Sequence, residues 1–211
     1  MITNVIGKVT CFITRKIDDK LQLLLIQHPN AGNQIPAGTV ELDENFKHAA
    51  IREAIEETGI EEYHSCTLIG SQEQLFDEKY ILYKPAKIYS KPDVSSFQWA
   101  EIRRGITVLH ERKHKEFVQV SYIEGDQYPN PNYISYQITG WVEEANLASK
   151  VMRHFYHLQA NSKLNEWAIE TDQHTFKLFW APLENLPPIV SPQDNWLAYF
   201  LKELKQLTDS L

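Results

Sequence analysis

The chain has 211 residues, 43% of them apolar, which is enough to build the core of one large domain. Its formal charge of -7 argues against general binding of nucleic acid, which relies on clustered Lys and Arg. It contains no apolar run of about 18 residues, and its first residues lack the regions of a signal peptide, so we expect a cytoplasmic protein without a membrane span.

The first elements predicted are two strands joined by a turn. Residues 4–14 and 21–27 are rich in β-branched and apolar side chains, and the segment KIDDK separates them. A loop rich in proline and glycine follows. The chain then predicts a helix of about fifteen residues, with Asp43 as its N-cap and Gly59 directly after its end. A further strand is predicted at 65–75.

The second half of the chain predicts mostly strands. Residues 75–150 alternate in the manner of strands around the proline-rich segment GDQYPNPN, which indicates a mostly β insertion. Strands at 151–159 and 175–183 precede a final amphipathic helix opened by Ser191 and Pro192. The predicted buried face of that helix consists of Trp196, Leu197, Phe200, Leu201, Leu204 and Leu207.

The two cysteines predict no metal or disulfide chemistry. Cys11 and Cys66 lack CxxC spacing and lie in apolar, strand-like segments. We therefore expect both to be small buried side chains.

Three glutamates crowd the end of the predicted helix. Glu53, Glu56 and Glu57 are spaced i, i+3 and i+4, so their carboxylates repel one another. The last helical turn also carries the negative end of the macrodipole, where Lys or Arg would be favourable. A hard divalent cation such as Mg²⁺ resolves both problems, because it takes oxygen ligands and keeps positions for water and phosphate oxygens. Arg52 can hold one carboxylate by two hydrogen bonds and fix its direction.

With the residues before it, this helix resembles the Nudix box. Residues 38–60, GTVELDENFKHAAIREAIEETGI, fill every fixed position of the pattern G-x5-E-x7-R-E-U-x-E-E-x-G-U, where U is aliphatic. Ala54 is smaller than the usual Leu or Val at the first U. An acidic solvated helix would explain the glutamates, but not their spacing from Gly38 and Glu44. The matching positions are Gly38, Glu44, Arg52, Glu53, Glu56, Glu57, Gly59 and Ile60.

The resemblance implies an α/β fold, namely a Nudix-type α/β/α sandwich with a mixed sheet. We expect residues 1–211 to form a single Nudix domain. Its core would comprise residues 1–74 and 151–211, with a mostly β insertion at about 75–150.

The resemblance also implies an activity. Nudix enzymes cleave a nucleoside diphosphate linked to another group, by attack of water on phosphorus, with Mg²⁺ or Mn²⁺ bound to the box glutamates. At the matching positions Glu53, Glu56 and Glu57 are the expected metal ligands, and the Ala37 carbonyl is a further candidate. The alternative is a catalytically silent module that senses nucleotides or binds protein.

Catalytic roles are expected for three box residues. Glu53 is the preferred general base, while Arg52 and Glu44 support the ligand glutamates and the loop before the helix. Gly38 is expected to give that loop room to bend. Three acids of the segment NEWAIETDQH, taken as a loop, compete with Glu53 as the base: Glu166, Glu170 and Asp172.

The insertion offers candidates for substrate and partner binding. A basic patch could receive substrate phosphates, or it could protect a sheet edge: Arg103, Arg104, His110, Arg112, Lys113, His114 and Lys115. One or two of its aromatic residues could stack on a base, with the rest in the core or an interface: Phe97, Trp99, Tyr122, Tyr128, Tyr133, Tyr136 and Trp141. Because Nudix proteins frequently dimerise, we expect a homodimer through this β-rich segment.

Two histidines follow the insertion. His154 and His157 are spaced i, i+3 on a predicted strand, so they should lie on opposite sides and form no paired metal site. His154 is the better candidate for a role in the site.

The expected partner is a small nucleotide diphosphate derivative, not nucleic acid. The Pro or Tyr that marks ADP-ribose or diadenosine polyphosphate members is absent, because Phe76, Asp77 and Glu78 occupy those positions. The coenzyme A signature is also missing. A nucleoside triphosphate, a nucleotide sugar and a capped RNA end all fit.

Overall fold

A computed structural model describes residues 2–127, 131–171 and 174–209, with their side chains except those of 171, 174, 205 and 207–209. Tyr128, Asp172 and the side chain of Leu207, which the sequence singled out, lie outside this description. The chain divides into two compact units, one of residues 8–71 and 153–211 and one of residues 1–7 and 72–152.

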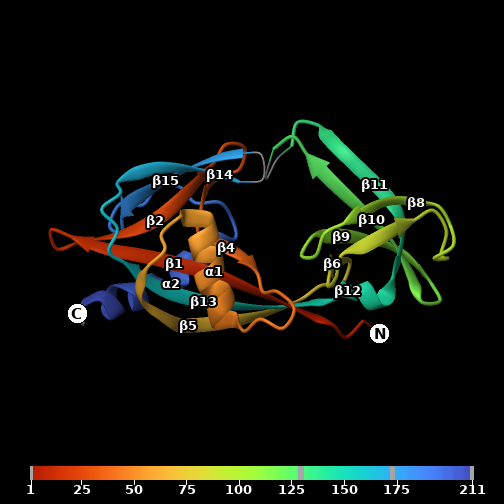
Figure 1. Ribbon diagram of the computed structural model, residues 1–211, viewed down its shortest axis with the longest axis horizontal. Coiled ribbons are helices and arrows are strands. Elements are labelled where there is room, and N and C mark those ends of the chain that lie inside the picture. Colours follow the sequence, from red (N-terminus) through yellow and green to blue (C-terminus); the bar gives the residue numbers. More distant parts are fainter. Residues whose placement is uncertain (1, 128–130, 172–173, 210–211) are drawn as a thin grey trace. The chain divides into compact units, whose positions relative to one another are not determined.

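The first unit is built on a sheet with the strand order β14-β15-β2-β1-β13-β5, extended by β3 beside β2 and β4 beside β1 (Figure 1). The strands are β1 (Val5–Ile17), β2 (Lys20–His28), β3 (Gly32–Gln34), β4 (Ala37–Thr39), β5 (Tyr63–Leu75), β13 (Lys150–Ala160), β14 (Glu166–Thr171) and β15 (His174–Pro182). The predicted β1–β2 hairpin is confirmed. The assignment of the segment with Glu166 to a loop is wrong, because its apolar Trp167 and Ile169 alternate with polar residues as strand β14.

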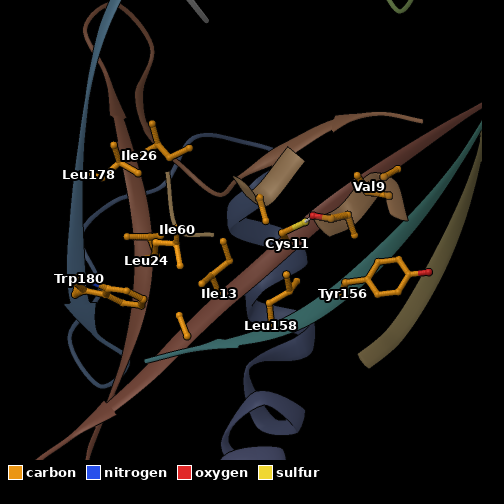
Figure 2. Close-up of a cluster of buried hydrophobic side chains, with 14 of the residues drawn as sticks. Val9, Cys11, Ile13, Leu24, Ile26, Ile60, Tyr156, Leu158, Leu178 and Trp180 are labelled. Carbon is orange, nitrogen blue, oxygen red and sulfur yellow. Dashed lines mark hydrogen bonds between the residues drawn. The ribbon is translucent and has the colours of Figure 1, made fainter. Parts of the chain in front are cut away.

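Alternate side chains of the central strands form two separate cores. Helix α1 (Phe46–Thr58) covers one face of the sheet and helix α2 (Gln193–Asp209) covers the other (Figure 1). Figure 2 shows the core on the α1 face, with Val9, Cys11 and Ile13 of β1, Leu24 and Ile26 of β2, and Tyr156 and Leu158 of β13. The α2 face holds Phe12, Leu23, Leu25, Phe155, Leu197, Phe200 and Leu204. One helical layer on each face of the sheet gives the expected α/β/α sandwich.

Helix α1 begins two residues later than predicted. Its N-cap is Asn45, whose side chain accepts a hydrogen bond from the His48 N–H at 2.9 Å. Asp43 is not the cap, because it adopts φ 67° in a turn just before the helix. Gly59 ends the helix as predicted, at φ 67°. None of the described helices is long and apolar enough to cross a membrane.

The second unit contains a sheet with the strand order β12-β6-β9-β10-β11-β7-β8. Its elements are β6 (Lys79–Leu82), β7 (Ala86–Tyr89), β8 (Gln98–Ile102), β9 (Thr107–His114), β10 (Phe117–Gly125), β11 (Ile134–Glu143), a 3-10 turn (Glu144–Asn146) and β12 (Leu147–Ala148). The predicted β character is therefore confirmed, although β8 was not foreseen. Val118, Val120 and Val142 lie in its buried core.

Both cysteines are free thiols, as predicted. Cys11 is fully buried beneath α1, and its Sγ donates to the Ala50 carbonyl at 3.2 Å. Cys66 is only partly buried, so the expectation of a buried side chain is confirmed for Cys11 alone.

Candidate active site

Two glutamates of α1 are held by the free edge of β4. The Thr39 N–H donates to Glu53 Oε1 at 3.1 Å, and the Ala37 N–H donates to Glu57 Oε2 at 2.9 Å. The other edge of β4 pairs with β1. The distance between the two glutamates along the helix matches the distance between the two N–H donors along the strand. Four helical residues rise about 6 Å, and two strand residues span roughly 6.6 Å. One short strand therefore fixes the direction of both carboxylates.

Gly38 lies between these two donors and makes the arrangement sterically possible. A Cβ atom at this position would lie 1.8 Å from Cδ of Glu53, so any side chain here would displace the carboxylate. The backbone of Gly38 does not occupy the left-handed region. The expectation that Gly38 gives the loop room to bend stays a prediction, and the feature that requires glycine here is the close approach of the Glu53 carboxylate.

Arg52 connects the carboxylates to one another. Its Nε and Nη2 donate to the two carboxylate oxygens of Glu44, both at 2.9 Å, so the predicted bidentate bond is made to Glu44. Nη1 donates to Glu53 at 2.9 Å and to Glu56 at 3.0 Å. Nη2 also reaches the Thr39 carbonyl at 3.1 Å. The guanidinium thus links the loop before the helix to two of its glutamates.

The pKa values of Glu53 and Glu44 are shifted in opposite directions. Burial raises the pKa of Glu53 above its ordinary value, although the charge and hydrogen bond of Arg52 act in the opposite direction. Hydrogen bonding to Arg52 lowers the pKa of Glu44. Glu44 is therefore an ionised anchor for Arg52, while burial makes Glu53 the more easily protonated of these two carboxylates.

The carboxylate oxygens of the site suit a hard divalent cation as ligands. The guanidinium of Arg52 contacts three carboxylates, and Glu57 adds a fourth one helical turn from Glu53, so negative charge is in excess and all four carboxylates offer oxygen ligands. Within the described part of the chain, however, no three His, Cys, Asp or Glu side chains already converge as a metal site. The contacts of Arg52 with Glu53 and Glu56 account for part of this lack of convergence. The guanidinium supplies the counter-charge, so these two carboxylates are directed toward it.

Two of the other acids considered as a general base, Glu166 and Glu170, lie on β14. Glu166 and Glu170 are exposed and alternate with Trp167 and Ile169, which pack with the core beneath α1. The strand period therefore directs both acids away from that core. Trp167 is a residue that the sequence reasoning missed: its Nε1–H donates to the Thr58 carbonyl at 2.8 Å, at the end of α1. The alternation in EWAIET could have revealed the strand, but not this contact.

His154 and His157 lie on opposite sides of β13, as predicted. His154 stacks on Phe46 with ring centroids 3.8 Å apart, on the α1 side. His157 is buried, and its Nε2 lies 2.8 Å from Thr14 Oγ1.

Much of the predicted basic patch is engaged within the second unit. Arg112 lies over the Trp141 ring at 5.3 Å, and Lys113 contacts Glu144 at 2.6 Å. Arg104 donates to the Tyr83 carbonyl at 2.8 Å. These contacts give the patch a structural role inside its own unit.

The fold and the site together define an α/β/α protein in which a helix presents box carboxylates to a strand edge. A family model described as the NUDIX domain matches residues 8–137, which is more than half of the chain. The chain belongs to the Nudix family, and it is a hydrolase acting on pyrophosphate bonds.

Solved structures give weaker likenesses. A crystal structure of a C. elegans Ap4A hydrolase binary complex is 12% identical, with 98% of this chain and 99% of that chain covered and a TM-score of 0.41. A protein from Listeria monocytogenes described as a NUDIX hydrolase is 14% identical, with 84% and 78% covered and a TM-score of 0.36. No curated protein matches the sequence. The family assignment therefore rests on the NUDIX domain match.

Proposed function

We propose that the protein is a Mg²⁺- or Mn²⁺-dependent pyrophosphohydrolase that cleaves a nucleoside diphosphate linked to another small group. The observation that carries this proposal is the pair of hydrogen bonds from Thr39 and Ala37 to Glu53 and Glu57. Like charges one helical turn apart destabilise a helix, so a strand that orients them favours a function over a role in folding.

Glu53, Glu56 and Glu57 would hold the ion, together with the Ala37 carbonyl. The carbonyl and N–H of one strand residue point to the same edge, so this carbonyl lies on the side of Glu57. When bound, the ion would neutralise charge on phosphate oxygens and lower the pKa of water.

We propose Glu53 as the general base. Its raised pKa brings the carboxylate closer to the range in which it accepts a proton efficiently at neutral pH. The proton of the attacking water passes to Glu53 as the water oxygen bonds to phosphorus. The bridging phosphorus–oxygen bond breaks, and the leaving phosphate keeps its electron pair. Arg52 fixes the direction of Glu53, and Glu44 fixes Arg52.

We further propose a single Nudix domain with its core at residues 1–74 and 151–211, an insertion at about 75–150, and a homodimer formed through the insertion. Phe97, just before β8, and Trp99, on β8, support the dimer, because they are 68% and 57% exposed at the last strand of the sheet. The net charge of -7 favours a small nucleotide derivative over nucleic acid as the partner.

The test is hydrolysis of a mixed nucleotide panel with Mg²⁺ or Mn²⁺, measured as release of phosphate or nucleoside monophosphate. Glu57→Gln retains an oxygen that can accept from Ala37, so it should fold normally yet lose about 100-fold or more in turnover. Glu62→Gln, at an exposed position just after the box, is the matched control and should remain active.

Near-normal metal-dependent turnover by Glu57→Gln would refute the site. Binding of nucleotides without release across the panel would instead favour the silent sensing module.

A further inference from the structure

Two arginines of the first unit lie over tryptophan rings and have no carboxylate partner. Cζ of Arg15 is 4.5 Å from the centre of the Trp180 ring, and Cζ of Arg153 is 4.4 Å from the centre of the Trp196 ring. Neither guanidinium forms an ion pair with an acidic side chain in the described part of the chain. Withdrawing such a charge from water is unfavourable unless other groups compensate it.

Arg15 is compensated by oxygen atoms of the protein itself. Its Nε donates to Gln22 Oε1 at 2.8 Å, and its Nη2 donates to Asn165 Oδ1 at 2.9 Å. Its Nη1 donates to the carbonyls of Ser162 and Leu164 at 3.0 and 2.6 Å. All three nitrogen atoms have acceptors, and the residue is only 6% exposed. Arg15 therefore shows how this fold accommodates a guanidinium in a structural role.

Arg153 uses only its Nη1 in this way. That atom donates to Thr10 Oγ1 at 2.9 Å and to the Val9 carbonyl at 3.3 Å. Nε and Nη2 form no hydrogen bond with the described residues, and neither is among the buried atoms that lack a partner, so both are open to solvent. Burial lowers the pKa of Arg153 to about 10, so the group is still charged at neutral pH. The open edge is the one that binds carboxylates and phosphates through two parallel hydrogen bonds.

This open edge lies on the face of the sheet that α2 covers. Phe155, two residues along β13 from Arg153, contacts the Trp196 ring with centroids 5.4 Å apart. Gln193 fixes the start of α2: its Oε1 accepts from the Ile35 N–H at 2.5 Å, and its Nε2 donates to the Ile35 carbonyl at 3.0 Å. Trp196 follows one helical turn later, so its ring is held over the guanidinium. The box carboxylates belong to α1, on the other face (Figure 1).

We propose that Arg153 forms a binding site for a small oxyanion of the phosphate or carboxylate type, separate from the box. Two oxygen atoms of the anion accept from Nε and Nη2, while Trp196 covers one face of the guanidinium. The anion supplies the counter-charge that the described acidic side chains do not supply. The chain carries a net charge of -7, which repels anions in general, so binding here depends on this pair of donors.

The experiment titrates phosphate and acetate separately into the 211-residue chain, without divalent metal and at an ionic strength kept constant with sodium chloride. NMR follows the Nε–H signals of the arginines and the indole N–H signals of the tryptophans. The signals of Arg153 and Trp196 should shift and saturate. Tighter binding of phosphate would assign a phosphoryl group as the ligand, and tighter binding of acetate would assign a carboxylate.

Variants separate the paired donors from charge alone. Arg153→Lys keeps the positive charge and removes the paired donors, so it should weaken binding about ten-fold. Arg15→Lys is the matched control, because Arg15 has a similar ring contact and no open edge, and it should leave the affinity unchanged. Arg112→Lys is a second control, because Arg112 is exposed and lies over Trp141 at 5.3 Å. Melting temperatures check that each variant is folded.

The proposal is overturned if the Arg153 and Trp196 signals of the wild type respond to neither anion, or respond equally to chloride. Equal loss of affinity in Arg153→Lys and Arg112→Lys would also overturn it, because binding would then depend on charge alone. The wild-type titration remains decisive if Arg153→Lys does not fold.

Discussion

Glu53 and Gly38 are in direct contact, and this contact makes the site sensitive to a single methyl group. The Glu53 carboxylate occupies the volume in which a Cβ of residue 38 would lie. Its two fixing contacts, with Thr39 and Arg52, both depend on that position. A small group added at residue 38 should therefore displace the Glu53 carboxylate without unfolding the protein.

We predict that Gly38→Ala lowers turnover about 10- to 100-fold, because the new methyl group forces Glu53 away from both contacts. Turnover and melting temperature are measured together. Gly70→Ala is the matched control: its Cβ would lie 2.7 Å from the Phe200 ring, remote from the box, so it should lower the melting temperature and leave the turnover of folded protein unchanged. Unaltered turnover in Gly38→Ala would show that the contact has no catalytic role.

His157 is the buried residue that should make stability depend on pH. Burial lowers its pKa from 6.5 to about 4. Between these values the unfolded chain binds more protons than the folded one, so stability rises with pH. The contribution is fully present above about pH 6.5 and is lost as pH falls toward 4, at a total cost of about 3 kcal/mol.

We predict that His157→Gln flattens this acid slope. The free energy of unfolding by urea is measured at several values between pH 7 and pH 4. His64→Gln removes an exposed histidine and should keep the slope of the wild type. If His157→Gln keeps it as well, another group is responsible.

At the scale of elements, β14 completes the end of α1. The last turn of the helix contains no basic residue. The Trp167 indole N–H is the donor that reaches its Thr58 carbonyl. The loop before β14 is in turn fixed by Arg15, which donates to the carbonyls of Ser162 and Leu164 at 3.0 and 2.6 Å. The helix that carries the box is therefore supported by a strand from the last quarter of the chain.

We predict that Trp167→Phe lowers the free energy of unfolding by about 1 kcal/mol, because it removes this donor and keeps an aromatic ring. Urea unfolding measures the change. Trp99→Phe, at an exposed position of the second unit, should change stability by less than about 0.5 kcal/mol. Equal losses in both variants would contradict a specific role for the hydrogen bond.

At the scale of the whole molecule, the exposed aromatic pair of β8 leads to a prediction about assembly. Light scattering at micromolar concentration should give twice the mass of the chain, and Trp99→Glu should shift the mass to that of a monomer, since a charge would have to be buried in the interface. Tyr199→Glu provides the control, because Tyr199 is 81% exposed on α2. A monomeric wild type would rule out the dimer.

The sequence predicted those features that depend on local pattern. Runs of β-branched and apolar residues predicted β1, β2, β13 and β15, and Gly59 predicted the end of α1, because a left-handed residue there favours glycine. The box spacing predicted which carboxylates lie on α1.

The features that it missed depend on local turn geometry or on contacts between distant segments. Asn45 replaced Asp43 as the cap because of a turn before the helix. The space at Gly38 is set by a side chain fifteen positions later, and the Trp167 contact joins residues 109 positions apart. No periodicity within a single segment encodes such pairs.

The double hydrogen bond between Gln193 and Ile35 has a consequence for synthesis on the ribosome. The loop that enters the box emerges early, but the residue that fastens it is translated more than 150 positions later. Helix α1 is therefore translated long before this contact can form, because the intervening β unit is translated first. A ribosome stalled before residue 193 should carry a Nudix box that is fully translated but whose entry loop still lacks this contact.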